Sequence, residues 1–312
     1  MSKQLSMIER SRSLFRRAAR QAVLPLTENE LDELLQRVSL ASDINPGFAS
    51  NLMEIISQQN LRISSATATE MALRARDFLG VDDVEPLFNL PTLLDDKLNV
   101  MLFPVKLDRL DSACTLIDKS AFIFISEVRQ ENVLFTCAHA LAHLIILSAR
   151  HSDEGGALLD PTDNMMASLK APYEHFADAF AQEFLIPSRG LGIALQNIRS
   201  LLNIKVGAIS DIQLLYLSRI FGVSLLTIAK RCEKEKLLPK GASAVLNRRL
   251  GEKHGGPEKR AEELGLPPRP EIKLAPVPYS LELALIKELK RSKALTGSAT
   301  RTPKSEGVSP IR

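Results

Sequence analysis

The chain has 312 residues, of which 45% are hydrophobic and 25% charged, so its composition excludes fibrous and low-complexity proteins. No apolar run reaches the ~18 residues of a membrane-spanning helix, and the first residues lack the apolar stretch of a secretory signal. Three scattered cysteines predict no disulfide framework, which fits the reducing cytoplasm. We therefore expect a cytoplasmic protein, and the lack of a long apolar run predicts that it does not enter a membrane.

The net charge of +3 is unevenly distributed along the chain. Residues 1–26 contain six basic residues and one acidic residue, and residues 251–312 contain twelve and eight. Residues 27–250 have the opposite balance, with 22 basic and 28 acidic residues. Basic ends of this kind could contact nucleic acid or an acidic partner, although most such ends are simply solvated.

The N-terminal part of the chain is predicted to be helical. Residues 7–23 form a basic amphipathic pattern, whose arginine and serine content would also suit a mitochondrial transit peptide. The sequence Thr27-Glu28-Asn29-Glu30 is a capping box before a second helix. A further helix begins near Thr67 and ends at Gly80, a residue type that suits the position after a helix. We assign residues 1–65 to a helical N-terminal segment.

The composition changes after Leu98, where short β-branched and aromatic runs predict strands. These runs cover residues 99–105, 113–118 and 121–126. The last two are expected to form a hairpin, followed by a helix with two histidines. Residues 155–164 contain Gly-Gly, Pro and Asp-Asn, which indicate an irregular connection before a helix that starts at Pro172. We expect an α+β fold, mainly helical, with a small and mostly antiparallel sheet beside the histidine helix in a core of residues 66–190.

The C-terminal part is predicted to be a helical extension, residues 191–250, followed by a tail. Within the extension, residues 211–221 and 225–236 have a helix-turn-helix pattern, with Ser224 as the N-cap of the second helix. Residues 251–312 are expected to hold a linker rich in Pro, Gly and charge up to residue 278, then a short helix and a disordered basic tail. Ser280 is expected to cap that helix, over residues 281–295, and the disorder is expected from residue 296.

His139 and His143 lie four residues apart in the sequence Phe-Thr-Cys-Ala-His-Ala-Leu-Ala-His. On an α-helix, positions i and i+4 face the same side, roughly 5–6 Å apart at Cβ. Both imidazoles can therefore reach one Zn²⁺ at about 2.0–2.1 Å. The His-Glu-x-x-His motif of metallopeptidases uses this spacing, with its Glu as general base. Ala140 occupies that position here, so the pattern predicts a metal site without its catalytic base.

A zinc site of the peptidase kind needs a third protein ligand. Glu174 is the candidate, 31 residues after His143 on the second predicted helix. Asp178, one turn further on, projects from the same face and could accept a hydrogen bond from a ligand imidazole. The alternative is that the two histidines are hydrogen-bonded core side chains and that Asp178 is solvated.

These motifs resemble those of the ImmA/IrrE-type zinc metallo-endopeptidases. That family has a Phe-Thr-x-Ala-His-Glu-Leu-Gly-His helix after a hairpin. A second helix reads Glu-x-x-Ala-Asn/Asp-x-Phe-Ala and ends in two apolar residues and Pro. The matching stretches of the chain are 135–139, 174–181 and 185–187, with a further likeness at 216–224. The resemblance covers about residues 66–245 and implies that His139, His143 and Glu174 bind zinc.

Two residues depart from the family pattern: Ala140 replaces Glu and Ala142 replaces Gly. The change at position 142 is mild because Ala favours a helix. A methyl group at position 140 can neither accept a proton from water nor return one to a leaving amine, a function worth about 10²–10⁴ in rate. We therefore expect no efficient peptidase activity. An engineered Glu→Ala change would give the same sequence.

Another residue could supply the missing base. His151, Asp153 and Glu154 lie in the connection after the histidine helix and could fold over the metal. Glu183 is nine residues after Glu174, about 900° of helical turn, which places it on the opposite face.

The remaining candidates have simpler interpretations. Cys137 is about 200° away from His139 around the helix, so we expect a small buried hydrophobic residue. His175 is expected to face away from the site, and His254 to lie on the surface of the linker. In the helix-turn-helix pattern, the second helix begins with Leu225-Leu226-Thr227, whereas a DNA-reading helix carries basic and amide side chains there.

The sequence thus predicts a metallopeptidase-like pseudoenzyme that binds Zn²⁺ and acts as a regulator by binding a protein, such as a transcriptional repressor or a stress regulator. One alternative is an active zinc endopeptidase with a substitute base from residues 151–154. The other is a DNA-binding regulator that uses residues 211–236 and the basic ends.

Overall fold

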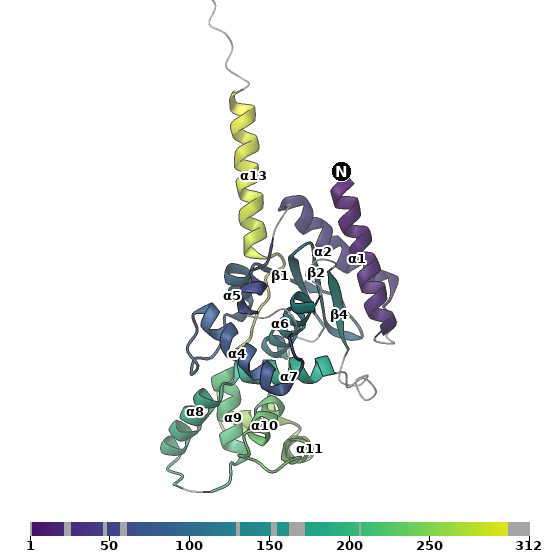
Figure 1. Cartoon of the computed structure of the whole chain (residues 1–312). Coiled ribbons are helices and arrows are strands. Elements are labelled where there is room, and N and C mark those ends of the chain that lie inside the picture. The colour runs from purple at the N-terminus through teal and green to yellow at the C-terminus, as the bar shows by residue number, and fades with distance from the viewer. Residues whose placement is uncertain are drawn as a thin grey trace, which may run out of the picture.

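A computed structural model of the chain describes residues 2–21, 26–45, 49–56, 61–128, 132–150, 155–161, 172–205 and 207–298 (Figure 1). Helices predominate, and four strands form one mixed sheet near the middle of the chain. The expected α+β fold is therefore confirmed.

The sheet has the strand order β1-β3-β2-β4. Its strands are β1 (Val100–Val105), β2 (Leu110–Ile117), β3 (Ser120–Ser126) and β4 (Gly156–Pro161). β1 is parallel to β3, whereas β2 is antiparallel to both β3 and β4, so the sheet is mostly antiparallel as predicted. The predicted hairpin joins β2 to β3 through Asp118 and Lys119, whose φ angles of 48° and 72° suit a tight hairpin turn.

β4 corrects the prediction of an irregular connection over residues 155–164. Residues 156–161 form a strand beside β2 at the end of the sheet, and residues 162–164 lie outside the described residues. Gly155 has a φ of 74°, and a Cβ there would lie 2.5 Å from the carbonyl oxygen of Leu116, so the strand entry requires glycine. Glycine before the strand and proline at its end are typical of turns. Because the strand has only six residues, these turn signals led to the prediction of an irregular connection.

The two N-terminal helices cover one face of the sheet (Figure 1). α1 (Ser2–Gln21) packs against β2 and β4, and α2 (Glu28–Ile44) packs against α1 and β1. Phe15 of α1 meets Phe124 of β3 edge to face, with ring centroids 5.9 Å apart, inside a buried apolar cluster. The N-terminal helices therefore shield a sheet face that would otherwise expose a row of aromatic side chains.

The opposite face of the sheet packs against α6 (Val133–Arg150), and α7 (Pro172–Leu185) lies along α6. The elements around them are α3 (Leu52–Ile55), α4 (Ser65–Leu79) and α5 (Leu90–Leu98). α6 is apolar and long enough to cross a membrane, but 83% of it is buried, as in a core helix of a soluble domain. α9 (Asp211–Phe221) and α10 (Leu225–Lys234) pass the same test only as one segment, and the chain bends by 106° between them.

Three helix ends follow the predicted signals. Thr27 and Glu30 form the capping box of α2, and Ser224 accepts a hydrogen bond from the backbone N–H of Thr227 at the start of α10. Gly80 follows α4 with a φ of 71°, the left-handed conformation in which glycine is favoured.

The C-terminal third is more ordered than the predicted linker. From Ser188 onward the chain forms α8 (Ser188–Leu201), α9, α10, α11 (Ala242–His254) and α12 (Pro257–Glu263). The last two occupy part of residues 251–278, where Gly255 and Gly256 form a tight corner and Pro257 begins the next helix. His254 is not a plain surface residue, because its Nδ1 lies 2.7 Å from Oε2 of Glu263.

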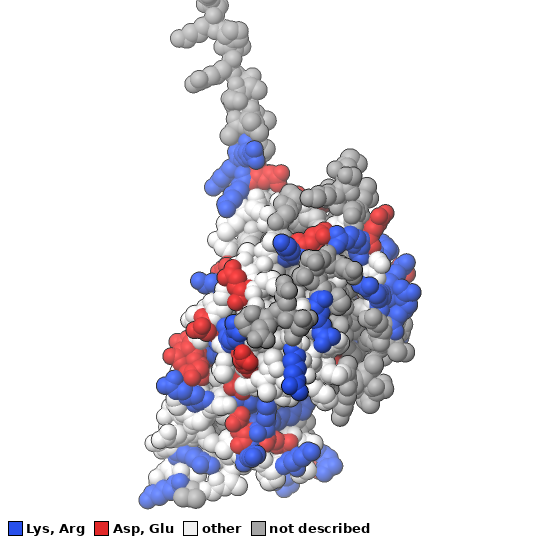
Figure 2. All heavy atoms as spheres, viewed as in Figure 1, with Lys and Arg blue, Asp and Glu red and all other residues white. Residues whose placement is uncertain are grey.

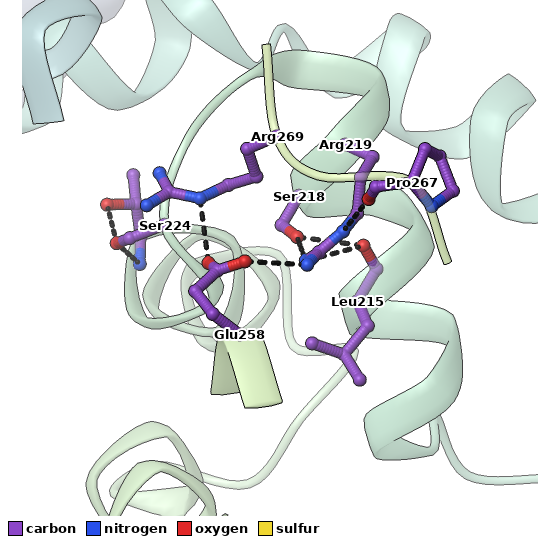
Figure 3. A network of polar contacts seen from close by, with 8 residues as sticks. Leu215, Ser218, Arg219, Ser224, Glu258, Pro267 and Arg269 are labelled. Carbon is purple, nitrogen blue, oxygen red and sulfur yellow. Dashed lines mark hydrogen bonds and ion pairs between the residues drawn. The ribbon is translucent and has the colours of Figure 1, made fainter. Parts of the chain in front are cut away.

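Glu258 of α12 forms ion pairs with Arg219 of α9 and with Arg269, which follows α12 in the chain (Figure 3). Its two carboxylate oxygens lie 2.6 Å from Nη2 of Arg219 and 2.8 Å from Nε of Arg269. Arg219 also donates from Nε to the carbonyl oxygen of Pro267 at 3.1 Å. Pro267 and Arg269, which lie in the stretch that sequence composition assigned to a linker, are thus held beside α9 and α12.

α13 (Tyr279–Ser298) is the last described element and projects from the body of the protein (Figure 1). It begins one residue before Ser280, so the prediction that Ser280 is its N-cap is wrong. The Ser280 N–H donates to Asp95 of α5 at 2.8 Å, and the Ser280 hydroxyl donates to the same carboxylate. Residues 299–312 of the predicted disordered tail lie outside the described residues.

Candidate metal centre

His139 and His143 lie one turn apart on the same side of α6. Their Nε2 atoms are 3.0 Å apart, and the rings are inclined at 77°. Both histidines are buried, at 3% and 1% exposure. α6 is buried along most of its length at the centre of the core, so close packing restricts both imidazoles.

Glu174 lies in the first turn of α7 and brings a carboxylate to the two imidazoles. Its Oε2 is 3.1 Å from Nε2 of His139, and its Oε1 is 3.4 Å from Nε2 of His143. One donor atom from each of the three residues lies within 4.8 Å of the other two. Zinc ligands at about 2.0–2.1 Å from the metal stand roughly 3.3 Å apart in a tetrahedron, so these separations fit one ion.

The electrostatics of this cluster favour a cation. Burial alone would lower the pKa of His139, but the nearby Asp160, Asp178 and Glu174 carboxylates raise that pKa well above its usual value. Burial alone would raise the pKa of Glu174, but hydrogen bonds with His139 and His143 hold it well below its usual range. A divalent ion would take over the positive charge that the His139 proton supplies in the metal-free protein.

Asp178 lies behind His139, on the side away from the three donor atoms. Its Oδ1 is 3.3 Å from Nδ1 of His139, and its side chain is 45% exposed. This is an ion-pair distance, and Nδ1 of His139 has no partner that meets the geometry of a hydrogen bond. Asp178 is therefore placed where a carboxylate could orient a ligand imidazole, as predicted, and that role stays a prediction.

Comparison with known families gives a match over the elements that build this cluster. Residues 95–233 match the family described as the IrrE N-terminal-like domain. The chain contains an ImmA/IrrE-type metallopeptidase domain. The matched segment runs from α5 through the sheet and both site helices to α10, and it includes His139, His143 and Glu174. A search among curated proteins gave no match.

The ImmA/IrrE-type domain of this chain lacks a carboxylate at position 140. Ala140 is fully buried within the core on α6. A methyl group there packs well in an apolar core but has no lone pair with which to take a proton. The metal donors of the family pattern are thus brought together beside a position that cannot perform its usual acid–base chemistry.

One residue of the site was missed by the sequence analysis. Asp160 on β4 is 8% exposed, and its Oδ1 lies 3.7 Å from Nε2 of His139. Its Oδ2 accepts a hydrogen bond from the Ser112 hydroxyl at 3.2 Å. Burial raises the pKa of Asp160 to about 6. An isolated Asp before a Pro indicates a turn in the sequence, so only the strand pairing reveals its position.

The other candidates are distributed as follows. His151, Asp153 and Glu154, the predicted sources of a substitute base, lie outside the described residues. Glu183 faces away from the site, as predicted, and its Oε2 lies 2.6 Å from Nη2 of Arg231. Cys137 is fully buried and burial raises the pKa of its thiol, which agrees with a packing role. His175 is exposed.

Proposed function

We propose that the protein binds Zn²⁺ through His139, His143 and Glu174 and acts as a regulatory protein-binding module with little peptidase activity. The observation that carries the proposal is the approach of three donor atoms to within 4.8 Å of one another, beside an alanine at the position of the general base. The donors suit zinc because two imidazoles and one carboxylate are a recurrent zinc ligand set in peptidases.

A bound Zn²⁺ would supply Lewis-acid chemistry, polarising a carbonyl group and lowering the pKa of water. His139, His143 and Glu174 would hold the ion, and Asp178 would orient the His139 ring. Peptide hydrolysis also needs a group that moves protons between water and the leaving amine, which is worth about 10²–10⁴ in rate. Since position 140 offers no such group, the arrangement is better suited to holding a metal than to hydrolysis.

The proposed partner is a protein in the cytoplasm, such as a transcriptional repressor or a stress regulator. The ImmA/IrrE-type family implies partners of this class, on which its active members act by cleavage. Cys114, Cys137 and Cys232 are free and buried, which agrees with a reducing compartment. A protein that keeps the fold and the metal of a peptidase but loses the base could still bind such a partner.

Direct DNA recognition by α9 and α10 has less support. Arg231, one of the basic residues of α10, is fully buried, and the start of α10 is apolar. On the face shown in Figure 2, basic side chains are interspersed with acidic ones among the described residues, so that face offers no continuous basic surface. A phosphate backbone is bound mainly by clustered lysine and arginine.

Metal analysis of the purified full chain tests the proposal. We expect about one zinc ion per chain, and its loss in a His143→Ala variant, because the donors act together. Incubation with a peptide library should release few or no fragments by mass spectrometry. A protein without bound metal, or robust cleavage that depends on the metal, would overturn the proposal; the second result would support the alternative of a substitute base.

A further inference from the structure

Asp160 brings a carboxylate to the metal centre from the sheet rather than from a site helix. It lies on β4 opposite Ser112 of β2. Ala157 and Leu159 of the same strand belong to the core beneath α1 and α2. Because successive side chains of a strand alternate between its faces, Asp160 points to the other side, toward α6. The strand therefore directs a buried acidic group at the histidines.

The two carboxylate oxygens of Asp160 have different surroundings. Oδ2 accepts the hydrogen bond from the Ser112 hydroxyl at 3.2 Å. Oδ1 lies 3.7 Å from Nε2 of His139. That nitrogen is also 3.0 Å from Nε2 of His143 and 3.1 Å from Oε2 of Glu174. Nε2 of His139 thus has three further potential ligand atoms around it, at separations close to the edge of a zinc tetrahedron, roughly 3.3 Å.

The charges of the cluster also favour participation of Asp160. Two neutral imidazoles and one carboxylate around Zn²⁺ leave a net charge of about +1 in a buried site, and a second carboxylate makes the set neutral. Asp178 is poorly placed to supply that charge, because it is 45% exposed and lies on the far side of the His139 ring. Asp160 is buried and lies on the donor side.

We propose that Asp160 is the fourth protein ligand of the metal, so that the centre is a closed structural site. The inference rests on the proposed function, since it assumes that His139, His143 and Glu174 bind the ion. Asp160 is not part of the set whose donor atoms all lie within 4.8 Å of one another, so its side chain turns toward the ion on binding. A closed site keeps no position for water or for a substrate carbonyl, in contrast to a catalytic zinc site.

A closed metal site would explain why position 140 carries an alanine rather than a general base. A general base is useful only where water can reach the metal. With Asp160 in the fourth position, a carboxylate at position 140 would be a buried charge without a function, and an apolar side chain is the more stable choice. The two features, Ala140 and Asp160, are therefore consistent with one structural role.

Cobalt substitution tests the coordination independently of any activity. The full chain is loaded with Co²⁺ in place of Zn²⁺, and its visible absorption is recorded during a titration with acetohydroxamate, which binds a metal only at an open position. We expect no spectral change for the unmodified protein and a clear change for Asp160→Ala. Asp160→Asn retains the size of the side chain and an acceptor for Ser112, and it guards against misfolding, which circular dichroism checks. We expect the spectrum of this variant to respond as well.

Asp178→Ala is the matched control, because it removes a carboxylate that lies near His139 but on the other side of the ring. We expect it to weaken zinc binding by about 10–100-fold, as for outer partners of metal ligands, and to leave the cobalt spectrum insensitive to acetohydroxamate. Asp160→Ala should weaken zinc binding by more than about 100-fold, the upper end for outer partners.

The outcomes separate this inference from the proposed function. If the unmodified cobalt protein responds to acetohydroxamate as strongly as Asp160→Ala does, the fourth position is open and Asp160 is not a ligand, while the proposed zinc binding stands. If the unmodified protein takes up neither zinc nor cobalt, both proposals are overturned.

Discussion

Arg231 of α10 is fully buried, and its Nη2 lies 2.6 Å from Oε2 of Glu183 on α7. Its Nε also donates to the carbonyl oxygen of Ile186 at 2.9 Å, just after α7 ends. α7 is the helix whose first turn carries Glu174. The arginine therefore joins the helical extension to one of the two helices that build the metal centre. It pairs with Glu183, the carboxylate that the sequence placed on the opposite face of that helix from Glu174.

We expect Arg231→Met to lower the free energy of unfolding by about 3–5 kcal/mol, because it leaves Glu183 buried without its cation. Urea denaturation followed by circular dichroism measures this loss. The double variant Arg231→Met/Glu183→Leu should recover most of the stability, since it replaces both charges by apolar groups of similar size. An unchanged urea midpoint for the single variant would show that the pair is not a stabilising link.

Zinc affinity should rise with pH through the neutral range. Burial by itself would lower the pKa of His139, but Asp160, Asp178 and Glu174 raise it by more. The imidazole therefore keeps a proton at neutral pH in the metal-free protein. Zinc must displace that proton, and the competition weakens as pH rises. Glu174 has a lowered pKa and releases no proton. Below about pH 6, protonation of Asp160 should weaken binding further.

Competition with a chelator of known affinity, repeated at several pH values, measures this slope. Asp178→Asn is the matched control, because it removes one of the carboxylates that raise the pKa of His139. Its affinity should depend less steeply on pH. A zinc affinity that does not change across the neutral range would contradict the prediction.

The stability of the metal-free protein should have the opposite pH dependence. A histidine whose pKa is higher in the folded than in the unfolded state stabilises the fold when it is protonated. For His139 this stabilisation is complete below its ordinary pKa of 6.5 and is lost as pH rises through the raised value. Thermal unfolding of the chelator-treated protein should therefore occur at lower temperature as pH rises above neutral. A His139→Gln variant should not show this decline, and a decline of equal size in that variant would assign it to another group.

The helical half of the candidate site could be predicted because helix geometry is local. His139 and His143 face one side of α6 for the same reason that any residues four apart do, and the chain needs no tertiary information to bring them together. Glu174 could be proposed only from its motif, because a separation of 31 residues along the chain from His143 has no geometric meaning of its own. The two helices meet through packing that the spacing does not encode.

Asp160 could not be predicted, since its place depends on two long-range arrangements. β4 must pair with β2 so that Asp160 stands opposite Ser112, and α6 must pack on that face of the sheet. The Gly and Pro residues around the strand indicated a loop instead. The role of α1 and α2 was hidden for a similar reason: their amphipathic patterns predicted helices, but not the sheet face that they cover.

Restoring a glutamate at position 140 separates two physical causes of impaired catalysis. If only the base is missing, Ala140→Glu alone should cleave peptides. If Asp160 also fills the fourth position, the single variant should remain nearly inactive, because water and substrate are still excluded from the metal. We expect Ala140→Glu/Asp160→Ala to exceed either single variant by at least about 10²-fold, the lower end of what a general base contributes. Cleavage of a peptide library, measured by mass spectrometry with and without a chelator, provides the comparison.

Ala140→Gln/Asp160→Ala is the control, because Gln is similar in size to Glu but takes up no proton. The activity of this control should therefore stay at the level of Asp160→Ala. Equal activity of Ala140→Glu and the double variant would mean that Asp160 leaves the metal accessible and that the alanine alone accounts for the lost chemistry.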